Sequence, residues 1–238
     1  SDVYTRQIVT DVEGVFTADP RIINSAKLID EITYDEMLEM SSSGAGVLMA
    51  RSVEFGRRYN VPIIVKSTFT NNKGTVVKEK TMEEAIVSGV THNDKEVKFT
   101  LFGVPDQPGI AGTVFGSLSE IGINVDMIVQ NVSKESITDI SFTAPSEQQK
   151  DVEDALKNIS KQLDAKGYDV DENIARISII GAGMKSESGV ASKMFKTLGN
   201  NKINISMIST SPIRVSCVIS SNDIEKALNV LHEEFITN

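Results

Sequence analysis

The spacing of apolar residues from position 97 onward predicts a small α/β unit. Apolar and polar residues alternate through most of 97–103, which is typical of a strand with one buried face. From 109 to 121 the apolar positions recur at intervals of three and four, as on one face of a helix. Two more strands are predicted over 124–129 and 138–142, followed by a helix near 147–163. With one further strand, this order is the ferredoxin-like βαββαβ plan.

The same pattern recurs 80 positions further along the chain. Gly109 precedes Asn124 by 15 residues, and Gly189 precedes Asn204 by the same 15 residues. The strand before each glycine, the helix after it and the strand that begins at each asparagine match at one offset. We therefore interpret this region as two copies of one unit. The strands and last helix of the second copy are predicted at 177–181, 204–208, 213–219 and 222–235.

The first third of the chain follows a different pattern, in which helices alternate with apolar strands. Thr33 and Glu36 are spaced as a capping box, which predicts a helix over 33–40. The alternation predicts an α/β fold with a partly parallel sheet. A second helix and two strands are predicted at 47–59, 61–65 and 75–77. The three parts of the chain are accordingly 1–81, 82–165 and 166–238.

Composition excludes several classes of function. The 238 residues carry a net charge of −9, which disfavours binding to nucleic-acid phosphates. No apolar run approaches the roughly 20 residues that span a bilayer, and the first residues lack the features of a signal peptide. Cys217 is the single cysteine, so we expect no internal disulfide and a reducing, cytoplasmic setting. His92 and His232 have no partner at metal-ligand spacing, so no metal site is expected.

The glycine loops of the two copies are candidate ligand sites. A loop that starts a helix leaves backbone N–H groups without partners at the positive end of the helix dipole, where a carboxylate can bind. Gly109 and Gly189 allow close approach of a ligand. Asp106, Asn124 and Asp126 offer acceptors for an ammonium group, so an amino acid is the matching ligand. The alternative is that the glycines only form tight turns and Asp106 only caps the helix.

Several segments together carry a resemblance to one family. In the repeat they are 102–111, 123–131, 181–184 and 203–211, and in the first part they are 10–21, 34–40, 44–48 and 51–54. Both copies of the repeat resemble the paired ACT domains of the aspartate kinases, and residues 10–21 resemble the nucleotide-side motif of that family's kinase domain. The resemblance implies the C-terminal portion of an amino-acid-kinase α/β fold over 1–81, followed by two ferredoxin-like ACT domains.

The resemblance implies ATP-dependent phosphorylation of the L-aspartate side chain, with Mg²⁺ accompanying ATP. The product, 4-phospho-L-aspartate, starts the routes to lysine, threonine and methionine. By similarity, the residues expected to line the nucleotide pocket are Thr10, Asp11, Phe16 and Arg21. Arg21 is chemically suited to phosphate contacts. Asp11 and Asp19 alternatively serve only as turn residues.

The resemblance also implies feedback control by lysine, threonine or both. In this family an ACT copy pairs with a copy from another subunit, and the effector binds at the seam, so a homo-oligomer is expected. The second copy has Ser206 where the first has Asp126, and lacks an equivalent of Asp106, so it is expected to bind more weakly or only to pack. The effector residues expected in the first copy are Asp106, Gln107, Gly109, Ile110, Ala111, Asn124, Asp126 and Gln130.

One family feature is missing from the sequence. The Lys-Phe-Gly-Gly segment that binds phosphate in these kinases is absent, so we assign no catalytic residue and expect the 238 residues alone to be inactive. An alternative is a non-catalytic regulatory subunit built mostly from the ACT pair. Such a subunit usually starts near Met82, whereas about 80 residues precede that position here, which favours the kinase. Residues 10–21 likewise argue against an unrelated ACT sensor.

Overall fold

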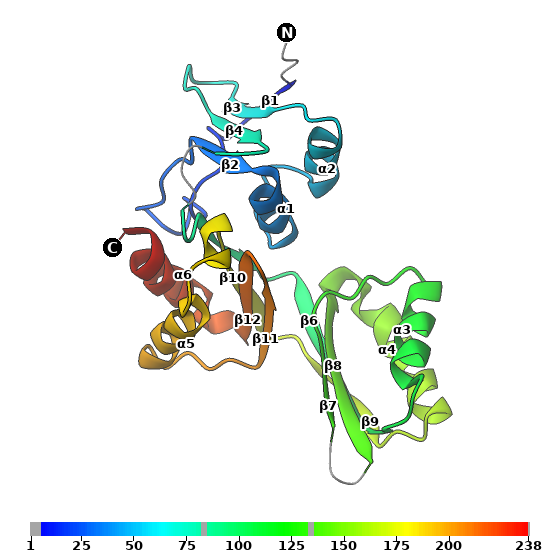
Figure 1. Ribbon diagram of the computed structural model, residues 1–238. Coiled ribbons are helices and arrows are strands. Elements are labelled where there is room, and N and C mark those ends of the chain that lie inside the picture. Colours follow the sequence, from blue (N-terminus) through cyan, green and yellow to red (C-terminus); the bar gives the residue numbers. More distant parts are fainter. Residues whose placement is uncertain (1–5, 82–84, 133–135, 238) are drawn as a thin grey trace. The chain divides into compact units, whose positions relative to one another are not determined.

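The computed structural model describes residues 6–81, 85–132 and 136–237 (Figure 1). Two compact units make up the chain. The inserted unit is Asp94–Ala175, and the outer unit combines Ser1–Asn93 with Arg176–Asn238. The chain therefore leaves the outer unit once, completes the inserted unit and returns.

The inserted unit has the predicted ferredoxin-like order of elements. Its antiparallel sheet has the strand order β7-β8-β6-β9, and α3 and α4 lie together on one side of it (Figure 1). Phe99 and Phe142 stack in its core with ring centroids 5.4 Å apart, and Phe115 packs edge-on against Phe142. The elements are β6 (Glu96–Pro105), α3 (Ile110–Glu120), β7 (Ile128–Val132), β8 (Ile137–Pro145), α4 (Gln149–Gln162) and β9 (Gly167–Asp171).

The second copy of the repeat forms a sheet with the order β11-β12-β10-β5. All seven residues of β10 are buried, so both of its edges need a neighbouring strand. One neighbour is β12, and the other is β5, which precedes the inserted unit in the chain. Besides β5 (Gly89–Asn93), the elements are β10 (Ile174–Ile180), α5 (Val190–Asn200), β11 (Met207–Ser211), β12 (Arg214–Ser220) and α6 (Ile224–His232).

The units differ from the predicted parts 82–165 and 166–238. β9 follows position 165 but pairs with β6, so it completes the first copy. β5 follows position 82 but pairs with β10, so it completes the second copy. The sequence predicts one further strand in each copy but gives neither its position nor its partner, because the partner of a strand can lie far away in sequence.

The first part of the chain forms a mixed sheet with the order β1-β3-β4-β2. The pairs β1–β3 and β2–β4 are parallel and β3–β4 is antiparallel, in agreement with the predicted partly parallel sheet. The capping box at Thr33 and Glu36 is present at the start of α1. The elements are β1 (Arg6–Thr10), β2 (Glu31–Thr33), α1 (Tyr34–Ser42), α2 (Ala50–Arg58), β3 (Ile63–Ser67) and β4 (Thr75–Lys78).

Several predicted elements begin too early, three of them by at least three residues. The helix predicted from 47 begins at Ala50, and the strands predicted from 124 and 204 begin at Ile128 and Met207. Before β7, the Asp126 N–H donates to the Thr143 carbonyl and the Met127 N–H to the Thr143 hydroxyl. This irregular attachment satisfies the backbone without a regular ladder, so apolar spacing alone predicts a longer strand.

The single cysteine lies in the core of the second copy. Cys217 is fully buried on β12. Burial raises the pKa of its thiol to about 12, which keeps the sulfur protonated and unreactive at neutral pH. The helices of the described residues include none that is long and apolar enough to cross a membrane.

Candidate functional site

The loop between β6 and α3 presents an open helix start. Gly109 has φ +97° and precedes α3 without any side-chain cap. No heavy atom lies within 4 Å of the position that a Cβ would take there. Since the first N–H groups of a helix lack partners within it, this loop suits a carboxylate ligand. Asp106 and Ile110 are half-buried in the same loop, and Gln107 and Ala111 are exposed.

Asp126 lies at the opposite end of the sheet from Asp106. The Asp126 N–H donates to the Thr143 carbonyl at 3.1 Å, and Thr143 pairs with Lys98 near the start of β6. Asp106 instead directly follows the last residue of β6. The intervening length of strand corresponds to roughly 20 Å. The structure therefore does not bring the two carboxylates together within one copy.

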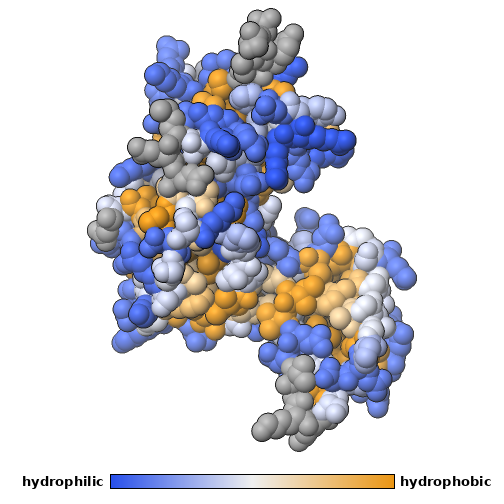
Figure 2. Space-filling view, viewed as in Figure 1, coloured by the Kyte–Doolittle hydropathy of each residue, from blue (hydrophilic) through white to orange (hydrophobic). Residues whose placement is uncertain are grey.

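The remaining effector-site candidates lie along the outer strand of this sheet. Gln130 is exposed on β7, and Asn124 is exposed just before that strand. β7 pairs with β8 and forms the edge of the sheet. Ile128 on β7 is 49% exposed, and Ile208 at the matching position of β11 is 44% exposed. Figure 2 also shows apolar surface over the strands of the inserted unit. Such an edge is a template for pairing with another chain.

The matching loop of the second copy is partly covered. Gly189 has φ +92° and open space around it, like Gly109. The start of the loop, however, packs against the segment before β5: a Cβ at Gly181 would lie 2.1 Å from the Ile86 carbonyl oxygen. The Gly183 N–H donates to the Ala85 carbonyl. The two copies thus share a backbone but differ in how much of the loop a ligand reaches.

The predicted nucleotide residues lie on β1 and on the loop that follows it. Thr10 ends β1, and its hydroxyl donates to Asp11 at 2.9 Å. Phe16 forms an isolated bridge with Leu28. Arg21 has an 88% exposed side chain that is paired with Asp19. Among the described residues, no hydrogen bond joins Thr10 or Asp11 to Phe16 or Arg21.

Comparison with known proteins identifies the parts. The amino acid kinase family matches residues 5–67, and the ACT domain matches residues 98–164 and 177–235. An aspartate kinase of Pseudomonas fluorescens is 47% identical over 96% of this chain. A solved structure of aspartokinase alpha and beta subunits is 39% identical, with a TM-score of 0.60, and covers 63% of this chain and 98% of its own. The chain belongs to the aspartate kinase family.

E. coli aspartokinase III has a similar structure in two states. In complex with aspartate and ADP, it has a TM-score of 0.84 and 27% identity, over 98% of this chain and 53% of its own. In complex with lysine and aspartate, it has a TM-score of 0.77 and 26% identity, over 98% of this chain and 52% of its own. The present chain spans 56% of the length of the Pseudomonas aspartate kinase.

In this aspartate kinase family member, a loop of the kinase part packs into the hydrophobic core of the second ACT domain. Ala18 and Ile23 lie in the loop that follows β1 and are buried among residues of that ACT domain. The Val90 N–H of β5 donates to the Thr17 carbonyl at 2.8 Å. Thr17 and Ala18 lie within the 10–21 motif, but the sequence predicted no contact between this loop and an ACT domain. The available signal was the β-branched apolar pair Ile22 and Ile23 directly after the charged Arg21.

The Glu36 carboxylate is a second junction between these parts. It is 3% exposed, and one oxygen accepts from the Thr33 N–H and hydroxyl, which completes the capping box. The other oxygen accepts from the Ser88 hydroxyl at 2.5 Å and the Ala182 N–H at 2.9 Å. This buried carboxylate therefore connects the start of α1 with Ser88, just before β5, and with Ala182, in the loop that follows β10 of the second ACT domain. Its charge is tolerated because four donors surround it.

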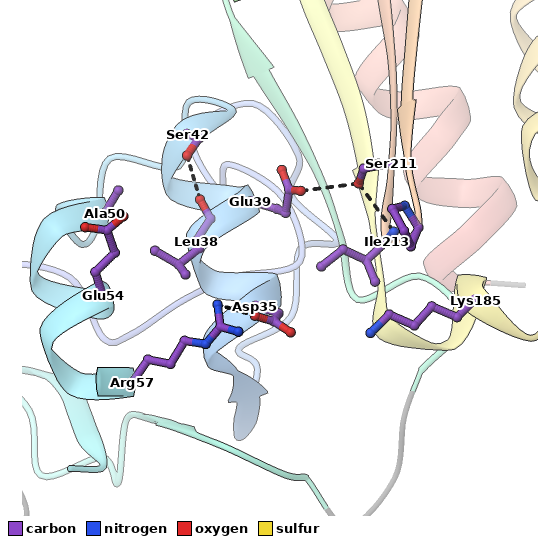
Figure 3. Close-up of a pocket in the computed structure, with 11 residues that line it drawn as sticks. Asp35, Leu38, Glu39, Ser42, Ala50, Glu54, Arg57, Lys185, Ser211 and Ile213 are labelled. Atoms are coloured by element: carbon purple, nitrogen blue, oxygen red, sulfur yellow. Dashed lines mark hydrogen bonds and ion pairs between the residues drawn. The ribbon is translucent and has the colours of Figure 1, made fainter. Parts of the chain in front are cut away.

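A cavity of about 450 Å³ lies between α1, α2 and the turn joining β11 to β12 (Figure 3). Asp35 and Arg57 pair across it at 2.9 Å, and Glu39 pairs with Arg214 at 3.0 Å and accepts from the Ser211 hydroxyl. The Asp35–Arg57 pair joins α1 to α2, whereas the two Glu39 contacts hold α1 against the second ACT domain. The lining residues are Asp35, Leu38, Glu39, Ser42, Ala50, Glu54, Arg57, Lys185, Ser211, Pro212 and Ile213.

Acidic and histidine side chains do not cluster as a metal site in the described ranges 6–81, 85–132 and 136–237. Within them, no group of three or more His, Cys, Asp or Glu residues is placed to hold a metal ion.

Proposed function

We propose that this chain serves an aspartate kinase that transfers the γ-phosphoryl group of ATP to the side-chain carboxylate of L-aspartate. The kinship with aspartate kinases over 96% of the chain and the nucleotide-side residues support the proposal. Thr10, Asp11, Phe16 and Arg21 contribute to the nucleotide pocket, and Mg²⁺ enters bound to ATP. The product, 4-phospho-L-aspartate, feeds the synthesis of lysine, threonine and methionine.

Arg21 is the nucleotide residue whose role is easiest to test. Asp19 accepts from its backbone N–H at 2.9 Å and from its guanidinium at 2.6 Å, which orients an otherwise exposed cation. The Arg21 hydrogen bond lowers the pKa of Asp19, so the pair stays ionised at neutral pH. Replacing Arg21 removes a phosphate ligand that Lys or Met cannot reproduce.

Arg21→Met is expected to raise the KM for ATP about tenfold in the kinase at its natural length, since it removes a charge-assisted hydrogen bond to phosphate. A coupled assay of ADP release measures the effect. Arg58→Met, which removes another exposed arginine, is the control and should leave the KM unchanged. The 238 residues by themselves should show no turnover. An unchanged KM for ATP in Arg21→Met would rule out the phosphate role.

The inserted unit is proposed as the first ACT domain of a lysine- or threonine-sensing site that two subunits complete. The carrying observation is the separation of Asp106 and Asp126 at opposite ends of one sheet. Antiparallel pairing of two edge strands places the start of one strand beside the end of the other. The Asn124–Asp126 side of one ACT copy then lies next to the open glycine loop of another. The acidic side chains bind the amino group of the ligand, and the backbone N–H groups of the loop bind its carboxylate.

Effector binding then biases the kinase by population shift. A ligand that is held only in the paired arrangement stabilises that arrangement relative to the others. E. coli aspartokinase III, solved with lysine and aspartate in a T-state and with aspartate and ADP in an R-state, supports control of this kind. The second copy has Ser206, just before β11, in place of Asp126, so its contribution to the ammonium contact is weaker.

Ile128→Lys is expected to abolish both subunit pairing and effector binding, because a charge on an edge strand opposes strand addition. Asp106→Ala should weaken binding at least tenfold but leave pairing intact. Calorimetric titration with lysine and with threonine, and sedimentation analysis, separate the two effects. Asp169→Lys, exposed on the opposite edge strand β9, is the matched control. An unpaired Ile128→Lys protein that still binds effector would show that the pocket lies within one chain.

A non-catalytic regulatory subunit is the second candidate function. The aspartokinase alpha and beta subunit structure supports it, because 98% of that solved chain is covered at 39% identity. The amino acid kinase match over residues 5–67 favours the kinase instead. The turnover assay decides: a natural-length protein that binds lysine or threonine but releases no ADP would be such a subunit.

A further inference from the structure

The nucleotide-side loop is hydrogen-bonded to the last helix of the chain. The Thr17 hydroxyl lies 2.9 Å from His232 Nε2, although the two residues are 215 positions apart. Ser25, on the returning side of the same loop, has its hydroxyl 3.4 Å from His232 Nδ1. His232 is 1% exposed at the end of α6. One imidazole ring therefore contacts both sides of the loop that carries Arg21.

The loop has a fixed base and an exposed tip. At the base, the Thr17 N–H donates to the Lys27 carbonyl and the Lys27 N–H donates to the Thr17 hydroxyl. Ala18 and Ile23 are buried in the core of the second ACT domain. At the tip, the Arg21 side chain is 88% exposed. The contacts that hold the base of the loop therefore determine the position of the Arg21 guanidinium at its tip.

We propose that His232 is a positioning residue for nucleotide binding, through which the second ACT domain holds the Thr17–Lys27 loop and thereby Arg21 in place. The proposal rests on the nucleotide role proposed above. It gives the second ACT copy a function of its own: its C-terminal helix is a support for the kinase part, whether or not its own loop binds a ligand.

A neutral histidine fits this network. With the Lys27 N–H donating to Thr17 Oγ1, we assign the Thr17 hydroxyl as donor to Nε2 and the Nδ1–H as donor to the Ser25 hydroxyl. Burial, and next the charge of Lys27, lower the pKa of His232, in keeping with a ring that is uncharged at pH 7. Glutamine places an amide at the position of Nε2 and preserves the Thr17 contact, whereas phenylalanine fills the same space without a polar atom.

The test uses four variants of the natural-length kinase. His232→Phe and Thr17→Val each remove the contact from one side, and we expect each to raise the KM for ATP at least fivefold with kcat changed less than twofold. His232→Gln should restore the wild-type KM. Leu231→Val, a buried change on the same helix without a polar contact to the loop, should lower the melting temperature but not alter the KM.

Hydrogen exchange of residues 17–27 supplies a readout that does not depend on turnover. Faster exchange of this loop in His232→Phe and Thr17→Val, together with the raised KM, supports the proposal. An unchanged KM in both variants overturns it, even if exchange is faster, as does an equal KM increase in Leu231→Val. Absence of ADP release in the wild-type protein would instead refute the kinase function itself.

Discussion

Phe142→Ala is expected to lower the free energy of unfolding of the inserted unit by about 3–5 kcal/mol. Phe142 is 0% exposed on β8, stacks on Phe99 and meets the edge of Phe115 at 5.6 Å between centroids. Truncation removes two aromatic contacts as well as buried area. The cavity would lie between the sheet and α3, so the sheet cannot close over it without moving a helix.

Hydrogen exchange of the β6 and β8 peptides measures this loss, because it reports the opening of the inserted unit separately from the outer unit. Phe102→Ala is the matched control: Phe102 lies on the same strand as Phe99 but is 37% exposed, and its loss should cost about 1 kcal/mol or less. Equal effects of the two substitutions would contradict a packed aromatic core in the first ACT domain.

Gly44→Ala is expected to destabilise the outer unit by about 3 kcal/mol or more. Gly44 has φ +109°, and a Cβ there would lie 1.9 Å from the His92 carbonyl oxygen of β5. Backbone strain and a clash with backbone act together, and neither is relieved by rotation of a side chain. The glycine is therefore required by the contact between the end of α1 and the second ACT domain.

Gly46→Ala is the control for this prediction. Gly46 stands two residues away, with no heavy atom within 4 Å of a Cβ, and its φ is not positive. The same substitution there should be neutral or slightly stabilising, since alanine restricts the unfolded chain. Thermal melting of the two variants measures the difference. A melting temperature of Gly44→Ala equal to that of Gly46→Ala would show that β5 does not approach α1 this closely in solution.

The two ACT copies differ in what surrounds their glycine loops and their cores. The first keeps the acidic groups and an open glycine loop with free space around it. In the second copy, the start of the loop is hydrogen-bonded to Ala85 and Glu36. Ala18 and Ile23 of the kinase part are packed into its core. A repeat that is symmetric in spacing is thus asymmetric in structure: the first copy has an open loop, and the second is joined to the kinase part.

Sequence by itself determined the local features of this protein. The paired spacing of Gly109 and Gly189 predicted two equivalent helix starts, and both glycines have positive φ. Thr33 and Glu36 predicted a capping box, which is present. These features depend on contacts between residues a few positions apart, where the identity of each residue restricts the backbone directly.

Tertiary structure alone decided which strands complete each sheet, and which groups meet. β5 pairs with β10, although the sequence of the inserted unit lies between them. Asp106 and Asp126 lie at opposite ends of one sheet. Thr17 is hydrogen-bonded to His232, which is 215 positions away in sequence. Strand and helix patterns specify a buried face but not the partner that covers it. The partner is determined by the packing of segments that are distant in sequence, and the spacing of residues within one segment carries no information about it.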